Sequence, residues 1–419
     1  MRKQLKTIFF FSFLFYSSFY AQRPQEALQQ ALALKKECAW EAAIEQFEVA
    51  YLHYADNISF LYKYAHTLKD GQCTQQAIKQ YKNILALDPS VALAHLDLGF
   101  CYLSLGDFQN GWLELFWRSP QIKQFPRVTI SNFDFSGKTV LIRAEWGMGD
   151  MIQFIRFADS LRQRGATVIL QAYPALVKLL QSCTCIDAVF PVGEAFPEHD
   201  IQIPLMSLME VAEASLENLP TAAYLQADPE LVEFWEKKLE DAIFFAWFDP
   251  SSPLASPDRQ AFNIGVCWSG RGGQEIHPKI RKNIPLKLLK TLSEIPGVKF
   301  YSLQKENDED QLADKNWIET FGPDFDDTHG RFMDTAAVMK HLDLVLTVDT
   351  SIAHLAGALG VPVWIMLPYT ADWRWMQNRN DSPWYPTARL FRQTEPGNWN
   401  SVVTQIEGAL QEKLAKQNG

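Results

Sequence analysis

The chain has 419 residues, 47% of them hydrophobic and 21% charged, which is typical of a globular protein with two or three domains. Its net charge of −10 argues against a nucleic-acid-binding surface, because such a surface needs a basic stripe to neutralise phosphates. Six cysteines are present without a Cys-x-x-Cys pair or Cys/His zinc spacing, so neither a metal site nor a disulfide framework is indicated.

Residues 1–21 have the form of a signal peptide, with basic residues before a short apolar run from Thr7 to Ala21. The run is too short for a confident transmembrane helix, which needs about 20 apolar residues. Ala21 suits the residue before a cleavage site, but Phe19 is bulky where a small side chain is expected. Three interpretations stay open: a cleaved export signal, an uncleaved membrane anchor, or an extension without a targeting role.

Residues 24–125 contain a 34-residue periodicity in side-chain size. Small residues that let paired helices approach closely recur with this period, and so do large residues that fill the groove between them. The three sets are Ala31, Ala65 and Gly99; Ala43, Ala77 and Gly111; and Phe47, Tyr81 and Leu115. The segment resembles three tetratricopeptide repeats, and the alternative is an unrelated helical bundle.

A short helical array of this kind has more than one use. Three repeats are close to the minimum for a stable stack. Such arrays bind peptides or partner proteins in a groove, and they also serve as spacers or dimer surfaces. No residue in the array is a candidate for catalysis.

Residues 137–242 begin with a strand, a glycine-rich turn and a helix, which is the start of a Rossmann-like domain. The strand is predicted at 139–143, and Gly147 and Gly149 form the turn. A lone Gly-x-Gly is either a tight turn or a place where ligand approaches backbone. Asp150 follows in the first helical turn, as a helix cap, a general base, or both. Gln153 is placed with this acceptor-side loop.

Residues 243–262 include the Pro-rich stretch Asp249–Pro257 and are predicted to be a linker. A second Rossmann-like half is predicted at 263–419. Its first strand, at 263–268, leads into a basic glycine-rich loop that is either an anion-binding loop or an exposed mobile one. Arg281 nearby, and Lys305 at the end of a strand predicted at 299–303, are candidate phosphate ligands.

The segment 342–366 reads as strand, turn, helix, glycine stop and strand. Asp349, Thr350 and Ser351 fall at the helix N-terminus, where free N–H groups and the helix dipole favour a phosphate. His354 lies one turn further on, as a structural hydrogen-bonded residue or as a ligand contact.

From about residue 138 to residue 414 the chain resembles glycosyltransferase family 9, the heptosyltransferase-like enzymes. The motifs are Gly147–Asp150, Arg281–Pro285 and Asp349–Gly357, and Pro368–Trp375 and Pro383–Tyr385 resemble repeat-containing bacterial members more closely. The resemblance implies a GT-B fold of two Rossmann-like domains. Together with the helical array that precedes them, the expected fold class is α plus α/β. It implies that Asp150 is the catalytic residue and that the late loop, with Asp349, Thr350, Ser351 and His354, contacts the donor.

The chain departs from that family in two ways. Heptosyltransferases lack the repeats, and their late loop usually reads Asp-Thr-Gly where this chain has Ser351. Both departures put a heptose donor in doubt. Repeats before a GT-B half are similar, in architecture only, to the protein O-linked N-acetylglucosamine transferases.

The predicted function is inverting, metal-independent transfer of a sugar from a nucleotide-sugar donor to a glycan, lipopolysaccharide-type or protein acceptor. No cofactor is expected. One alternative is a non-catalytic scaffold with a degenerate transferase half. Another is an NAD-dependent oxidoreductase, which the incomplete Gly-x-Gly-x-x-Gly pattern disfavours.

Expected partners are the donor, the acceptor and a protein bound in the groove of the array, with no nucleic acid. Nucleotide sugars are generally made and used in the cytoplasm. A cytoplasmic catalytic region is therefore expected. As an uncleaved anchor Thr7–Ala21 would hold it at the membrane, and the same segment is also compatible with a secretory signal peptide.

Overall fold

The computed structural model describes residues 23–118, 133–247, 261–271, 277–313 and 315–417. The signal-like segment 1–21 and the Pro-rich stretch Asp249–Pro257 lie outside these residues. Among the residues that are described, no helix combines the length and the apolar character needed to cross a membrane. The chain divides into two compact units, Met1–Lys123 and Gln124–Gly419.

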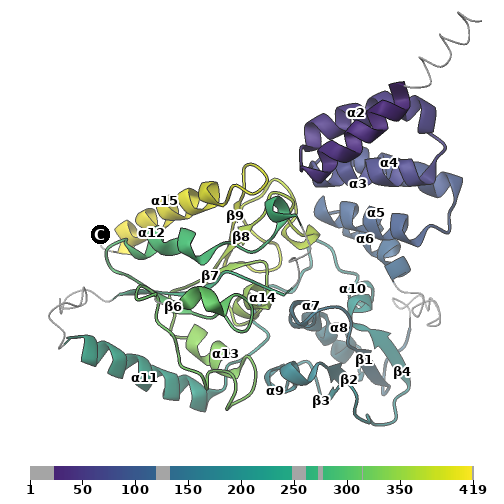
Figure 1. Ribbon diagram of the computed structural model, residues 1–419. Helices are drawn as coiled ribbons and strands as arrows, with labels where there is room; N and C mark the ends of the chain where they lie inside the picture. Colours follow the sequence, from purple (N-terminus) through teal and green to yellow (C-terminus); the bar gives the residue numbers. More distant parts are fainter. Residues whose placement is uncertain (1–22, 119–132, 248–260, 272–276, 314, 418–419) are drawn as a thin grey trace, which may run out of the picture. The chain divides into compact units, whose positions relative to one another are not determined.

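The first unit is helical, and its helices are joined by short turns (Figure 1). They are a helix over residues 23–36, α2 (Trp40–Tyr54), α3 (Ile58–Asp70), α4 (Thr74–Leu87), α5 (Ala92–Ser104) and α6 (Phe108–Leu115), followed by the 3-10 turn η1 (Phe116–Arg118). The starts of α2, α4 and α6 are 34 residues apart, and so are those of α3 and α5.

Small residues sit where paired helices cross in this unit. Gly99 in α5 and Gly111 in α6 face each other, and a Cβ at Gly111 would lie 2.5 Å from Leu103 Cγ. Phe47 and Tyr81 are fully buried between the helices. The side-chain sizes read from the sequence therefore match the packing observed at these positions.

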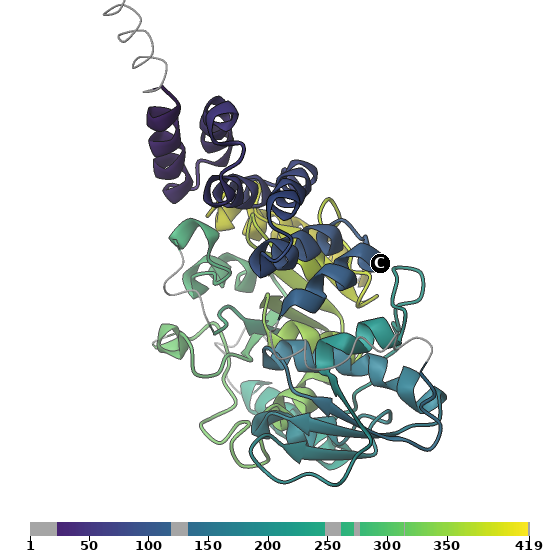
Figure 2. The same cartoon turned by 90° about the vertical axis from the view of Figure 1, so that its right-hand side faces the viewer.

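The second unit contains two parallel sheets, each flanked by helices (Figures 1 and 2). The first has the order β3-β2-β1-β4, and the second has the order β6-β5-β7-β8-β9. The strands are β1 (Thr139–Arg143), β2 (Thr167–Ala172), β3 (Ala188–Pro191), β4 (Ile201–Pro204), β5 (Phe262–Cys267), β6 (Val298–Ser302), β7 (Leu344–Val348), β8 (Val363–Leu367) and β9 (Ala388–Arg392). Every strand pair in both sheets is parallel.

The strand order places a reversal at β1 in the first sheet and between β5 and β7 in the second. From β1 the chain moves outward to β2 and β3 and then returns to β4 on the other side. From β5 it moves to β6 and returns to β7. Ligands of open parallel sheets bind beyond the carboxyl ends of the strands at such reversals. The segments that follow β1, β5 and β7 are therefore in the position where ligands of such sheets bind.

Helices and 3-10 turns cover these sheets, and α7 and α14 begin at the carboxyl ends of β1 and β7. In the first sheet they are α7 (Met148–Phe154), η4 (Ile155–Phe157), α8 (Ala158–Gln163), η5 (Pro174–Leu176), α9 (Val177–Leu180), η6 (Leu205–Ser207) and α10 (Leu208–Val211). In the second they are η7 (Pro278–Ile280), η8 (Leu286–Leu289), α12 (Lys290–Ser293), η9 (Glu309–Leu312), α13 (Met333–Met339), α14 (Ser351–Ala358), η10 (Trp373–Trp375) and α15 (Trp399–Gln417). β7 and β8 are buried along their whole length, as expected for central parallel strands.

The predicted linker needs a correction at both ends. Residues 243–247 belong to the helix α11 (Pro229–Trp247), because no proline or glycine interrupts the chain before Pro250. Phe262 is already the first residue of β5. The edge strand β9 and the helices α11 and α15 were not identified from the sequence.

Candidate functional site

A cavity of about 740 Å³ lies at the carboxyl ends of the strands of both sheets in the second unit. Most residues predicted from the sequence as site residues line it. They are Gly147, Gly149 and Asp150 after β1, Lys305 after β6, and Asp349, Thr350, Ser351 and His354 after β7. Arg281 and Gln153 are not among the residues that line it.

Asp150 sits in the first turn of α7 and is tied to the start of that helix. Its Oδ2 accepts a hydrogen bond of 2.7 Å from the Gly147 N–H. Gly147, not Asp150, is the N-cap residue. The Asp150 side chain is only 17% exposed. Burial raises the pKa of this carboxyl, while the charge of Arg374 and the Gly147 N–H act in the opposite direction.

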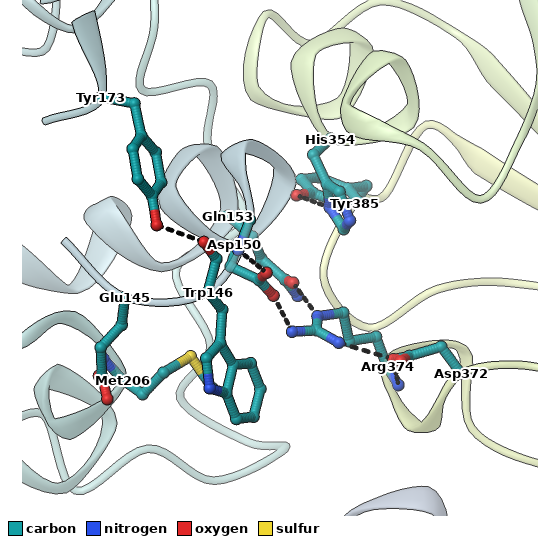
Figure 3. Close-up of polar contacts among 11 residues, drawn as sticks. Glu145, Trp146, Asp150, Gln153, Tyr173, Met206, His354, Asp372, Arg374 and Tyr385 are labelled. Carbon is teal, nitrogen blue, oxygen red and sulfur yellow. Dashed lines mark hydrogen bonds and ion pairs between the residues drawn. The ribbon is translucent and has the colours of Figure 1, made fainter. Parts of the chain in front are cut away.

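Arg374 approaches Asp150 from the second sheet (Figure 3). It belongs to the turn η10, which comes after β8, and one of its terminal nitrogens donates to Asp150 Oδ1. The other donates to Asp372 Oδ1 at 2.8 Å. The sequence segment around Arg374 was noted for its resemblance only. The sequence nevertheless contains one signal for a buried ion pair here: Arg374 lies between two tryptophans, two positions after Asp372.

Gln153 lies in the protein interior, not at the surface of the cavity. It is fully buried, and its Oε1 accepts a 2.8 Å hydrogen bond from Arg374 Nε. Because it lies one turn after Asp150 on α7, both side chains reach the same guanidinium (Figure 3). Its placement with an acceptor-binding loop is therefore corrected: Gln153 holds Arg374 and does not line the cavity.

Gly149 is required by helix packing. A Cβ at this position would lie 2.9 Å from His354 Cδ2 and 3.5 Å from Ser351 Cα. The beginnings of α7 and α14 therefore touch, and this contact leaves no room for a side chain. His354 donates to or accepts from Tyr385 Oη at 2.9 Å, and burial holds its pKa well below the usual range. A neutral, hydrogen-bonded imidazole agrees with the structural interpretation of His354, although the residue also lines the cavity.

The turn between β7 and α14 presents a helix N-terminus to the cavity. Thr350 is the N-cap residue, and its Oγ1 accepts a 3.3 Å hydrogen bond from the Ile352 N–H. Asp349 precedes it, and burial followed by the charge of Asp372 raises the pKa of its carboxyl. Thr350, Ser351 and Ile352 all line the cavity, so the N-terminal end of α14 lies at the site, and a helix dipole favours an anion at this end.

The cations that line the cavity differ in their partners. Lys305 pairs with Asp327 at 3.1 Å, and both Arg271 and Arg331 pair with Glu306. Lys282 lines the cavity beside Gly270 and forms no ion pair with any acidic residue in the described part of the chain. Arg281 was predicted from the same basic cluster, and a cluster alone does not show which of its side chains lines the cavity.

Two aromatic residues, Trp146 and Tyr173, line the cavity on the side of the first sheet. Trp146 has a φ of +58°, which turns the chain between β1 and α7. Tyr173 Oη donates to the Trp146 carbonyl, and both residues line the cavity (Figure 3). Within the described residues, no group of three or more His, Cys, Asp or Glu side chains is placed to hold a metal ion.

Comparisons with known proteins give distant similarities. No family model matches the chain. Protein FlbA of Caulobacter vibrioides is 25% identical over 341 residues, which are 75% of this chain and 54% of that protein. The chain therefore spans about half the length of this curated relative.

Two solved structures are similar to about two thirds of the chain. The glycosyl transferase family 9 protein of Veillonella parvula has a TM-score of 0.47 and 12% identity, over 68% of this chain and 99% of that one. ADP-heptose lipopolysaccharide heptosyltransferase II of E. coli has a TM-score of 0.44 and 15% identity, over 67% of this chain and all of that one.

The raised pKa of Asp150 predicts a pH dependence of stability. The folded state holds a proton on this carboxyl more tightly than the unfolded chain, so ionising Asp150 costs folding free energy. Its contribution is complete below the unfolded carboxyl pKa and is lost as pH rises through the raised, folded pKa. The difference in unfolding free energy between the wild type and Asp150→Asn should therefore fall over that window, as measured by urea unfolding from pH 4 to 8. Parallel pH profiles would contradict the assignment.

Proposed function

We propose that the chain is a glycosyltransferase that moves a sugar from a nucleotide-sugar donor to an acceptor hydroxyl, with inversion and without a metal. One observation carries the proposal. A buried carboxylate at the start of α7 shares a cavity with the N-terminus of α14 and with Lys282, which forms no ion pair with an acidic residue in the described chain. The sequence motifs that resemble glycosyltransferase family 9 supply both helix starts.

The donor diphosphate fits the C-terminal half of the cavity. There the N–H groups at the start of α14 and the Lys282 ammonium offer positive charge to an anion. Both contacts strengthen as negative charge collects on the departing nucleoside diphosphate, so they stabilise the transition state. No metal is required for this charge balance.

Asp150 fits the role of general base in the N-terminal half of the cavity. The acceptor hydroxyl oxygen would bond to the anomeric carbon while the bond from that carbon to the diphosphate oxygen breaks on the opposite face. The hydroxyl proton passes to Asp150 and then to solvent. A carboxyl with a raised pKa is a stronger base than an ordinary aspartate, which suits this step.

The helical unit supports a partner-binding role. We infer that its 34-residue units are tetratricopeptide repeats that hold a protein partner or protein acceptor. Leu52 and Leu93 are 92% and 60% exposed, which gives the array apolar contact surface. We also infer that catalysis takes place in the cytoplasm, where nucleotide sugars are made, with residues 1–21 as an anchor.

A paired substitution separates donor binding from chemistry. Lys282→Met should weaken the binding of the preferred nucleoside diphosphate by roughly 10- to 100-fold, because a charged contact is lost. Asp150→Asn should lower turnover by roughly 10²- to 10⁴-fold and leave that affinity nearly unchanged. Calorimetry with ADP, UDP, GDP and CDP measures the first, and release of diphosphate from the matching nucleotide sugars measures the second.

The matched controls are Lys287→Met and Asp159→Asn, which remove the same charges from exposed positions in the same regions. Neither should change binding or turnover. If no nucleoside diphosphate binds the folded wild type, the scaffold interpretation replaces the enzyme.

The partner-binding role of the array is tested by Leu52→Glu combined with Leu93→Glu. The double variant should bind nucleoside diphosphate as the wild type does but transfer less sugar to the acceptor, or lose its partner in sedimentation. Unchanged transfer to a macromolecular acceptor would show that the array does not take part in substrate recognition.

The cytoplasmic assignment is tested by the mass of the chain isolated from expressing cells and by protease access in intact spheroplasts. We expect an uncleaved chain that is digested only after lysis. Cleavage near Ala21 with release to the outside would overturn the assignment.

A further inference from the structure

Arg374 is one of the most enclosed charges in the second unit. Its side chain is 8% exposed, and each nitrogen of its guanidinium group donates to a different side chain, those of Asp150, Gln153 and Asp372. The ring of Trp373 lies 4.5 Å from the guanidinium carbon. Figure 3 shows this group between the start of α7 and the turn η10. The rigid planar fork of arginine directs its donors at three separate acceptors, which the compact ammonium group of lysine does less well.

The turn that carries Arg374 is itself fixed. Asp372 Oδ1 accepts from the Arg374 backbone N–H at 3.0 Å as well as from its side chain. Trp384 Nε1 donates to the Arg374 carbonyl at 2.8 Å. Arg392 donates to the Met376 carbonyl at 2.8 Å. The guanidinium therefore has one supported position, and Asp150 is held against it.

The two cavity cations Arg374 and Lys282 differ in charge balance. Arg374 contacts two carboxylates, so its charge is already compensated. Lys282 has no such partner among the described residues. A diphosphate that bound to Arg374 would have to displace Asp150 or Asp372, whereas Lys282 can accept an anion directly.

We propose that Arg374 is a positioning residue for the catalytic carboxylate of Asp150. The C-terminal half then contributes the residue that orients the base, while Lys282 binds the diphosphate. The inference rests on the proposed function of Asp150. Arg374 fixes the orientation of the Asp150 carboxylate and opposes the effect of burial on its ionisation. The base is then competent only when both halves of the second unit are in contact.

The charges that face Asp150 set the direction of each effect. The groups that interact with it are Arg374 on η10, Asp372 just before η10, Lys282 before η8 and Tyr173 after β2. Asp349 before α14 and the uncharged His354 on α14 line the same cavity, and Glu145 after β1 acts on Tyr173. Arg374 favours the ionised carboxylate, and Asp372 disfavours it. Removal of Arg374 should therefore move the titration of Asp150 to higher pH, and removal of Asp372 should move it to lower pH.

The experiment compares the pH profile of turnover for two variants, with the nucleotide sugar whose diphosphate binds the wild type. Arg374→Gln should move the acid limb to higher pH, by about one unit or more, because burial is no longer opposed. Asp372→Asn should move it to lower pH. Arg374→Lys should restore part of the shift, and Arg379→Gln, in a surface ion pair with Asp381, should leave the profile unchanged.

Binding of the same nucleoside diphosphate gives the second measurement. Arg374→Gln should change its affinity less than threefold, in contrast to Lys282→Met. A large loss of affinity with an unmoved acid limb would make Arg374 a phosphate ligand and overturn the proposal. So would shifts of the two variants in the same direction.

A third measurement separates this proposal from the proposed function. If no nucleotide sugar is turned over, the titration of Asp150 is followed by urea unfolding, as the difference between each variant and its Asp150→Asn double variant. Arg374→Gln should move that titration to higher pH and Asp372→Asn to lower pH. If Arg374→Gln does not fold, Asp372→Asn alone decides the matter, and an unmoved titration overturns the proposal.

Discussion

The site depends on the contact between the beginnings of α7 and α14. Each of these helices starts where a buried strand ends, α7 after β1 and α14 after β7. They approach so closely that Gly149 has no space for a Cβ against His354. This contact brings the carboxyl edges of two separate sheets to one cavity. Without it, Asp150 and Ser351 would belong to two unrelated strand ends.

Bringing these edges together also buries carboxyl groups, and the neighbouring residues supply the hydrogen bonds and opposite charges that compensate for this burial. Asp150, Asp349 and Asp372 all lie at the cavity, and burial raises the pKa of the first two. Buried carboxylates are tolerated only with partners that replace water. Arg374 provides two of these contacts and the Gly147 N–H a third. These fixed donors compensate the charges of Asp150 and Asp372 at the edge of the cavity.

The sequence predicted the local parts of this arrangement well. The strand 139–143 and the helix start at Ser351 follow from apolar runs that end in glycine or capping residues, which are properties of a few adjacent positions. The small residues of the first unit followed from a repeated spacing. The helix α11 was partly assigned to a linker because the Pro-rich stretch beyond it dominated the composition there. The edge strand β9 combines apolar residues with arginines and was not distinguished from the loop around it.

The non-local parts were beyond the sequence of a single chain. Asp150 and Arg374 are 224 positions apart, and no local pattern connects them. Gln153 shares the helical face of Asp150, but its role follows only from the guanidinium that meets that face. Lys282 and Arg281 are neighbours in a basic run, and the fold alone decides which of them reaches the cavity. The role of the Trp373–Trp375 turn therefore depends on the arrangement of the two sheets, because its Arg374 pairs with Asp150, a carboxylate that follows a strand of the other sheet.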